Sequence, residues 1–261
     1  MDTNEIEKRY WAGLGIVHEA GRLAADQFHG RQHLDIEHKG TQDFVSEADR
    51  ACEDLIVGAL QKLFPDDGFL GEERGVQNAG GQATWIIDPI DGTANFLRGI
   101  PLWCVSLGLL VGNEAAVGVI YNPITEELYA ARHGNGATLN GKSIEVSKTT
   151  SLSEARLGIG FSYRRPVAQH AEAIKTLLDA HCEYNRLGSG ALGLALTADG
   201  RLDGYFEAHI NVWDVAAGLC IVKEAGGMMN DFLSNDGQQR GNSILAANPH
   251  LYASFNNLLN V

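Results

Sequence analysis

Apolar side chains recur every three or four positions near the start of the chain, and the pattern returns after a polar interval. The first stripe consists of Ile6, Tyr10, Leu14, Val17, Gly21, Ala24 and Phe28, and the second of Ala48, Cys52, Leu55, Ala59 and Leu63. Both stripes predict amphipathic helices. Ser46 and Asp49 form a capping box before the second helix, and Pro65 ends it. The loop between the helices carries residues 39–43.

Short apolar runs bounded by turn-forming residues follow. They cover residues 103–111, 115–121 and 127–131. Such runs are typical of strands, and Leu139-Asn140-Gly141-Lys142 predicts a type I′ hairpin. Residues 1–150 therefore predict helices followed by an antiparallel sheet.

From Ser151 onward the pattern alternates between strands and helices. Strands are expected at 156–161, 184–187 and 204–207, and helices at 166–180, 191–198 and 212–225. Asn211 is the expected N-cap of the last helix. This alternation predicts an α/β arrangement for residues 151–261. Because no linker separates the two halves, we expect one compact unit with a cleft between them.

Composition narrows the class of protein. The chain has 261 residues, of which 44% are hydrophobic and 20% charged, so it can bury a large core. Its formal net charge of −13 disfavours nucleic acid and anionic membranes as partners. The cysteines have no C-x-x-C spacing and are expected to be buried free thiols. Signal-peptide features are absent from the first residues, and the apolar run 102–111 is too short to span a bilayer, so the expected location is cytoplasmic.

Residues 85–96 join an apolar segment to two carboxylates, a hydroxyl and a glycine. Residues 85–87 are typical of a buried strand, and Pro89 cannot continue a ladder, so we expect a turn with Asp88 and Asp91 at the carboxyl end of the strand. Mg²⁺ prefers carboxylate oxygens, and two metal ions can share one carboxylate. The alternative is that aspartates beside Pro and Gly only form a turn.

Two further acidic motifs lie far away in the sequence, at Gly71-Glu72-Glu73 and Trp213-Asp214. On an extended segment Glu72 and Glu73 point to opposite faces, so we expect only Glu72 to face a metal. Asp214 lies in the first turn of the last predicted helix, where the helix dipole also stabilises a carboxylate without a metal. Distant segments can thus converge on one acidic cluster.

The three acidic motifs together resemble the signature of the inositol monophosphatase family of Mg²⁺-dependent, lithium-sensitive phosphatases. The matching segments are Gly71-Glu72-Glu73, Asp88-Pro89-Ile90-Asp91-Gly92-Thr93 and Trp213-Asp214-Val215-Ala216-Ala217-Gly218. The resemblance covers nearly the whole chain. It implies a homodimer and a fold of mixed α+β and α/β class, a layered α-β-α-β-α sandwich of the sugar-phosphatase type. It also implies two or three Mg²⁺ ions per active site, held by Glu72, Asp88, the Ile90 carbonyl, Asp91 and Asp214.

The resemblance also implies roles for individual residues. Glu72 and Thr93 would position the attacking water, and Asp49 would accept a hydrogen bond from Thr93. Gly92 and Thr93 open a helical turn whose free N–H groups suit a phosphate, although Thr93 is also compatible with an ordinary cap. The expected substrate contacts are Asp91, Gly188, Ser189, Gly190 and Glu207.

Four other features have competing interpretations. Residues 188–193 match G-x-G-x-x-G, but the expected βαβ context with an acidic residue ending the next strand is poorly met, which disfavours dinucleotide binding. Lys39 falls near the family's active-site lysine, in a loop shorter than the family's spacing. His209 can contact substrate or be structural. Arg164-Arg165 can attract an anionic substrate, although we favour a solvated loop.

These observations predict a Mg²⁺-dependent phosphomonoesterase for a small polyol phosphate, with inositol 1-phosphate as the leading substrate and water as the direct nucleophile. Related enzymes with the same metal ligands act on histidinol phosphate, fructose 1,6-bisphosphate or 3′-phosphoadenosine 5′-phosphate, so these remain alternatives. A regulatory, partner-binding protein on the same fold is the alternative from another class.

Overall fold

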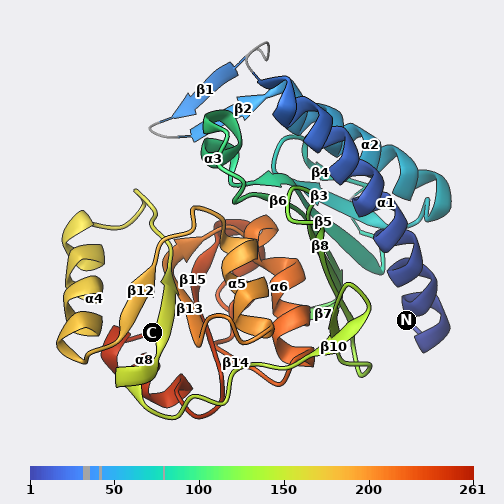
Figure 1. Ribbon diagram of the computed structural model, residues 1–261. Helices are drawn as coiled ribbons and strands as arrows, with labels where there is room; N and C mark the ends of the chain where they lie inside the picture. The colour runs from blue at the N-terminus through green and yellow to red at the C-terminus, as the bar shows by residue number, and fades with distance from the viewer. Residues whose placement is uncertain (32–35, 41–42, 79) are drawn as a thin grey trace.

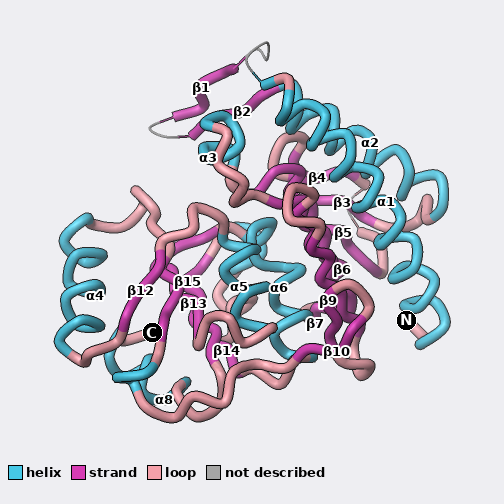
Figure 2. The backbone as a smooth tube through the Cα atoms, viewed as in Figure 1, coloured by secondary structure: helices cyan, strands magenta, loops and turns pink. Residues whose placement is uncertain are grey.

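The computed structural model describes residues 1–31, 36–40, 43–78 and 80–261. Helices and sheets alternate in five layers, α-β-α-β-α, which confirms the layered sandwich (Figures 1 and 2). None of the helices in the described ranges combines the length and apolar character that a membrane span requires.

Two long helices form the first outer layer. They are α1 (Thr3–His29) and α2 (Glu47–Leu63), as the apolar stripes predict. Val17 of α1 and Leu60 of α2 are fully buried in a cluster that includes Trp85 of the adjacent sheet. The polar interval between the helices is wrongly interpreted as a loop, because it contains β1 (Ile36–Gly40) and β2 (Asp43–Ser46). Thr41 and Gln42 lie outside the described residues.

The larger sheet has the strand order β10-β9-β8-β7-β6-β5-β3-β4. The strands are β3 (Gly68–Gly71), β4 (Gly75–Gln77), β5 (Ala83–Asp91), β6 (Cys104–Val111), β7 (Glu114–Asn122), β8 (Glu127–Arg132), β9 (Ala137–Leu139) and β10 (Lys142–Ile144). The turn between β9 and β10 has φ of +50° at Asn140 and +75° at Gly141, as a type I′ turn requires. The expectation of a wholly antiparallel sheet is wrong at one place. Since β4 folds back on β3 and the chain then reverses again, β5 pairs parallel with β3.

The central layer consists of α5 (Gly190–Ala198) and α6 (Val212–Glu224), which lie between the two sheets (Figure 1). Two glycines of the larger sheet permit this close packing. A Cβ at Gly108 would lie 2.8 Å from the Ala216 Cβ, and one at Gly118 would lie 2.1 Å from the Ala217 carbonyl oxygen. The sheet therefore fixes the position of α6.

The smaller sheet has the order β12-β11-β13-β15-β14. Its strands are β11 (Arg156–Ile159), β12 (Glu183–Asn185), β13 (Gly204–Ile210), β14 (Met228–Met229) and β15 (Asn242–Ala247). The helices α4 (Val167–Asp179) and α8 (Tyr252–Leu259) cover its outer face. The sequence patterns predict β11, β12, β13 and α4 but not α7 (Gly237–Arg240), α8, β14, β15 or the short helix η2 (Leu152–Glu154). The division of the chain at residue 150 stays a prediction.

Candidate active site

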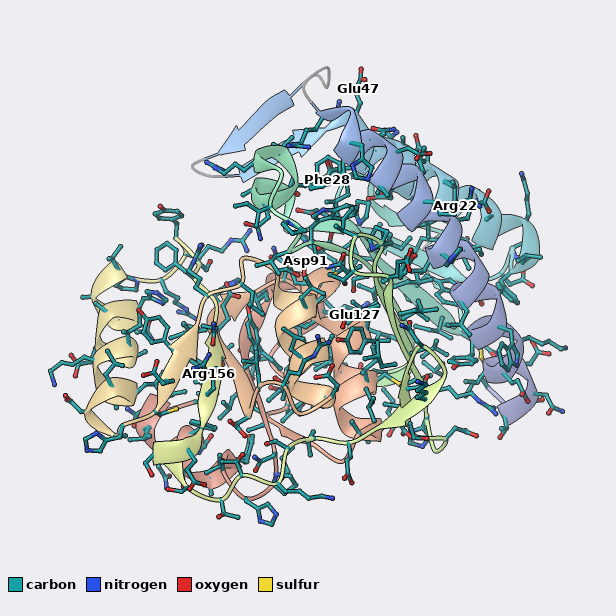
Figure 3. The ribbon with its side chains drawn as sticks, in the orientation of Figure 1. Arg22, Phe28, Glu47, Asp91, Glu127 and Arg156 are labelled. Carbon is teal, nitrogen blue, oxygen red and sulfur yellow. The ribbon has the colours of Figure 1, made fainter. Side chains whose placement is uncertain are left out.

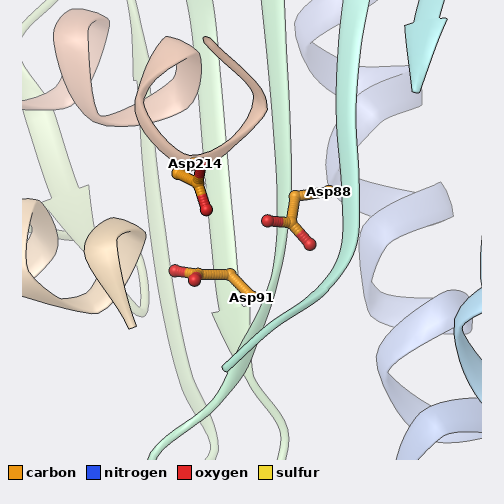
Figure 4. A group of neighbouring side chains, drawn as sticks. All are labelled: Asp88, Asp91 and Asp214. Carbon is orange, nitrogen blue, oxygen red and sulfur yellow. The ribbon is translucent and has the colours of Figure 1, made fainter. Parts of the chain in front are cut away.

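The strand β5 carries Asp88 and Asp91 inside the sheet rather than beyond its end. Asp88 pairs with Ser106 and Asp91 with Cys104, and the register shifts between the two pairs. The expected turn at Pro89 is therefore wrong, because a bulge accommodates the proline within the strand. Carboxylates three positions apart would face opposite sides of a regular strand. With the bulge, both point toward the same space (Figure 4).

The third carboxylate comes from α6. Asn211 is the N-cap of this helix, as expected, and its backbone N–H donates to Asp214 Oδ2 at 3.1 Å in a capping box. One carboxylate oxygen from each of Asp88, Asp91 and Asp214 lies within 4.8 Å of the others (Figure 4). The structure thus brings together side chains from distant parts of the chain.

Burial and mutual repulsion act on all three carboxylates. Desolvation, followed by the charges of Glu72 and Asp91, raises the pKa of Asp88 well above its usual value, and desolvation and Asp91 do the same for Asp214. Burial raises the pKa of Asp91 to about 6. A buried anionic cluster of this kind is unfavourable without a cation. Its oxygen donors fit a hard divalent ion such as Mg²⁺.

Glu72 and Glu73 lie in a turn rather than on an extended segment, which corrects the expectation, and the charge of Glu72 acts on Asp88 and Asp214. The Glu72 backbone N–H donates to the Ile87 carbonyl at 3.1 Å, and its side chain lines the same cavity as Asp91. The buried Glu53 carboxylate of α2 accepts the backbone N–H groups of Glu73 and Arg74, each at 2.9 Å. Glu53 of α2 therefore holds the turn that contains Glu72 in position.

Thr93 opens the short helix α3 (Thr93–Arg98), and Gly92 is its N-cap with φ of +101°. The Thr93 hydroxyl lies 3.3 Å from Asp49 Oδ1 and 3.0 Å from the Ile90 carbonyl oxygen. One hydroxyl proton can be donated to only one of these acceptors at a time, which leaves the oxygen able to accept a hydrogen bond from water. The structure thus brings Thr93, Asp49 and Ile90 together, and the resemblance implies the contact between Thr93 and Asp49.

The start of α5 is hydrogen-bonded to Asp91, the residue labelled at the centre of Figure 3. Asp91 accepts the Ser189 hydroxyl at 2.5 Å, the Ala191 N–H at 2.6 Å and the Gly190 N–H at 3.3 Å. The carboxylate therefore holds the segment that begins at Gly188 against the site. The glycine-rich segment therefore donates to a carboxylate of the protein, which differs from the phosphate binding of a dinucleotide-binding loop.

Glu207 lies on β13 in a cavity of about 280 Å³, together with Glu72, Asp91 and Asp214. Burial raises its pKa to about 7, and the Tyr205 hydroxyl, which donates to Glu207 Oε2 at 2.7 Å, acts in the opposite direction. The sequence reasoning missed Tyr205. Its position two residues before Glu207, on the same face of the strand, was the available signal.

Other cavity-lining residues were missed or left open by the sequence. The sequence does not single out Arg186. Arg164 lies exposed in a turn, in agreement with the solvated-loop interpretation, but it also lines the cavity, and its guanidinium donates to Asn211 Oδ1 at 2.7 Å. His209 also lines the cavity, and burial lowers its pKa. The Lys39 and Ser46 side chains lie outside the described part of the structure, so their roles stay predictions.

Comparison with known proteins identifies this arrangement. The model of the inositol monophosphatase family matches residues 6–260. The chain belongs to the inositol monophosphatase family. It is 40% identical to an inositol-1-monophosphatase of Mesorhizobium japonicum over 88% of each chain. It is 42% identical to the Nus factor SuhB of Xylella fastidiosa, over 83% of this chain and 79% of that protein.

Solved structures of the inositol monophosphatase family have the same fold. The extragenic suppressor protein SuhB of Bartonella henselae superposes with a TM-score of 0.89 at 35% identity, covering 95% of this chain and 96% of that one. The inositol monophosphatase of Anabaena gives 0.86 at 32% identity, covering 98% and 96%. Membership of this metal-dependent family supports phosphatase activity, and the acidic cluster agrees with it.

Proposed function

We propose that the protein is a Mg²⁺-dependent phosphomonoesterase that acts on a small polyol phosphate, with inositol 1-phosphate as the leading substrate. The observation that carries the proposal is the cluster of Asp88, Asp91 and Asp214 within 4.8 Å of one another, beside a cavity that also holds Glu72 and Glu207. A cavity of about 280 Å³ suits a small ligand rather than a macromolecule.

The metal ligands would be Glu72, Asp88, the Ile90 carbonyl, Asp91 and Asp214, for two or three Mg²⁺ ions. Bound Mg²⁺ lowers the pKa of water and stabilises negative charge on phosphate and leaving-group oxygens. Thr93 and Asp49 would orient the attacking water, since the Thr93 hydroxyl donates toward Asp49 and can accept from that water. The N–H groups of Gly92 and Thr93 would bind the phosphate. No residue of the protein becomes phosphorylated.

Substrate hydroxyls would contact residues of the second half of the chain, together with Asp91. Glu207 faces the cavity with its carboxylate oriented by Tyr205, and it can accept a hydrogen bond from a polyol. Asp91, Gly188, Ser189 and Gly190 complete the expected substrate contacts. Because the Ser189 hydroxyl donates to Asp91, its contribution includes holding that carboxylate in place.

The test is a phosphate-release assay with Mg²⁺ on inositol 1-phosphate, histidinol phosphate, fructose 1,6-bisphosphate and 3′-phosphoadenosine 5′-phosphate. We expect the highest kcat/KM on inositol 1-phosphate among the monophosphates. Lithium and calcium should inhibit, because neither reproduces the size, charge and octahedral geometry of Mg²⁺. Insensitivity to both ions at millimolar concentration would argue against the proposal.

A second candidate is a regulatory, partner-binding role, which the name of the Xylella relative favours. Absence of phosphate release from all four substrates, in a protein that binds Mg²⁺, would favour this role. The homodimer and the cytoplasmic location belong to the proposal as well. The dimer can be tested by sedimentation.

A further inference from the structure

The loop between β12 and α5 lies where the two halves of the chain meet. Its residue Gly188 has φ of +81° and lines the cavity of the candidate active site, together with Ser189 and Gly190. These three residues belong to the half that carries the smaller sheet, whereas most of the proposed metal ligands belong to the half that carries the larger sheet. The contacts between the halves therefore decide where this loop lies relative to the carboxylates.

The side chain of Asn95 in α3 connects the two halves at this loop. Its amide nitrogen donates to the Leu102 carbonyl at 2.7 Å and to the Leu187 carbonyl at 2.8 Å. A side-chain amide has two N–H groups, so it can satisfy both carbonyls at once. Leu102 follows α3 in the larger-sheet half, whereas Leu187 lies 92 residues beyond Asn95 in the other half. One side chain thus holds the cavity loop against the opposite half.

Two glycines with positive φ let the backbones approach closely beside this amide. A Cβ at Gly188 would lie 2.8 Å from Asn95 Nδ2, and a Cβ at Gly92 would lie 3.3 Å from the Gly188 carbonyl oxygen. Gly92 is the N-cap of α3 and a proposed phosphate contact. The turn expected to bind the phosphate therefore packs directly on the loop expected to bind the polyol, and Asn95 bonds to that loop.

The loop has a second attachment on the other side of Gly188. Asp91 accepts the Ser189 hydroxyl and the Ala191 N–H at 2.5 and 2.6 Å. Gly188 thus lies between a bond from Asn95 to the preceding residue and bonds from Asp91 to the following ones. Because the Asp91 bonds do not involve Asn95, removal of the Asn95 amide should loosen the loop at Gly188 and leave Asp91 in place.

The phosphate side of the contact is held by backbone bonds. The Gly92 carbonyl accepts the backbone N–H groups of Asn95 and Phe96 at 2.8 and 3.0 Å. A substitution of the Asn95 side chain keeps both bonds. Loss of the amide should therefore move the cavity loop relative to Gly92 and Thr93 rather than displace Gly92 and Thr93 themselves.

We propose that Asn95 is a positioning residue for substrate recognition, because it sets the spacing between the polyol contacts at residues 188–190 and the phosphate contacts at Gly92 and Thr93. The inference rests on the proposed phosphatase function and deepens it. Covalent structure fixes the distance between the phosphate and the hydroxyls of a substrate, so the cavity has to maintain a matching distance. Asn95 maintains it without being one of the expected substrate contacts.

The test compares Asn95→Ala with the wild type on the phosphate ester that has the highest kcat/KM in the four-substrate assay. We expect KM to rise about 10-fold, the equivalent of about one hydrogen bond to the substrate. The value of kcat should stay within about twofold, because the lost contacts bind substrate and transition state alike. The inhibition constant of inorganic phosphate should change by less than about twofold, since phosphate alone does not reach the polyol contacts.

Asn242→Ala is the matched control. The Asn242 amide also donates to two backbone carbonyls, those of Phe232 and Ser234, each at 3.2 Å, but both belong to its own half of the chain. This variant should keep the wild-type KM. Asn95→Leu, which keeps most of the side-chain volume and removes both donors, should raise KM as Asn95→Ala does.

KM distinguishes positioning from a general loss of structure, because it does not depend on the fraction of the sample that is folded. An unchanged KM in both Asn95 variants would overturn the positioning role, as would an equal rise of KM in Asn242→Ala. An inhibition constant of inorganic phosphate that rises as much as KM would also overturn it. Failure of the wild type to release phosphate from any of the four esters would instead overturn the proposed function.

Discussion

Glu53 offers a direct test of how the fold supports the acidic cluster. Asp49 and Glu53 lie one turn apart on the same face of α2, and both are fully buried. Asp49 accepts from Thr93, while Glu53 accepts two backbone N–H groups directly after Glu72. One helix face therefore positions two separate segments of the candidate site. We predict that Glu53→Gln weakens Mg²⁺ binding, although Glu53 is not itself a proposed metal ligand.

The size of the effect follows from the two hydrogen bonds. Glutamine keeps one acceptor but turns an NH₂ donor toward the other backbone N–H, which is left unsatisfied. Such a loss costs about 1–3 kcal/mol for a buried donor. The Glu53 carboxylate lies directly against Gly71, where only a glycine fits, so the same side chain also supports the residue before Glu72. Loss of a group that orients a metal ligand typically costs about 10- to 100-fold in metal affinity, and we expect a value in that range.

Calorimetric Mg²⁺ titration of the metal-free protein measures this loss, and urea unfolding measures the change in stability. Asp54→Asn is the matched control, since Asp54 is the adjacent carboxylate and binds the Arg74 side chain of the same turn from the exposed side. An exposed pair contributes about 0–1 kcal/mol, so this variant should bind Mg²⁺ almost as well as the wild type. Equal affinities in Glu53→Gln and the wild type, or equal losses in both variants, would refute the positioning role.

Three further predictions concern the carboxylates themselves. Asp88→Asn should abolish phosphate release. It should also raise the thermal midpoint of the metal-free protein, because it removes one of several buried like charges. Turnover near the wild-type rate would exclude Asp88 as a shared metal ligand. In the metal-free protein, the raised pKa values of Asp88, Asp91 (about 6) and Asp214 mean that the folded state binds more protons than the unfolded state. The stability that the folded state gains from these extra protons is fully present below the unfolded-state pKa values. It is lost as the pH rises through about 6 and above. Urea unfolding of the metal-free protein should therefore give a lower free energy of unfolding at pH 8 than at pH 5.5. Saturating Mg²⁺ should restore stability at pH 8. A free energy of unfolding that rises with pH in the metal-free protein would contradict this prediction. Glu207→Gln should change the ranking of inositol, histidinol and sugar phosphates, with a loss of about 1.5–3 kcal/mol on a hydroxyl-bearing substrate; equal losses on every substrate, or a large drop in Mg²⁺ affinity, would place Glu207 among the metal ligands.

The features that the sequence predicts well depend on local patterns. The stripes that form α1 and α2 are read from side-chain spacing, and the Asn140-Gly141 turn from the conformations that those residues allow. The three acidic motifs are also local, and their resemblance to a known family predicted that they would converge. The structure brings Asp88, Asp91 and Asp214 together as that resemblance implies.

The features that the sequence does not predict depend on partners distant in the chain. The bulge that turns Asp88 and Asp91 to one side is set by pairing with β6, and the parallel alignment of β3 with β5 is set by the order of the strands in the sheet. The strand β15 was missed although it pairs with β13 over most of its length. Its apolar run is short and, taken alone, cannot be distinguished from a buried helix segment.

The position of Asp214 shows how much of the candidate site is determined outside the motifs. Its own motif specifies a helix start, and Asn211 caps that start. The place of the helix in the molecule depends instead on Gly108 and Gly118, where any side chain would collide with α6. These glycines belong to no acidic motif, yet the approach of Asp214 to Asp88 and Asp91 requires them. The geometry of the three carboxylates should therefore be as sensitive to the packing of α6 against the larger sheet as to substitutions of the carboxylates themselves.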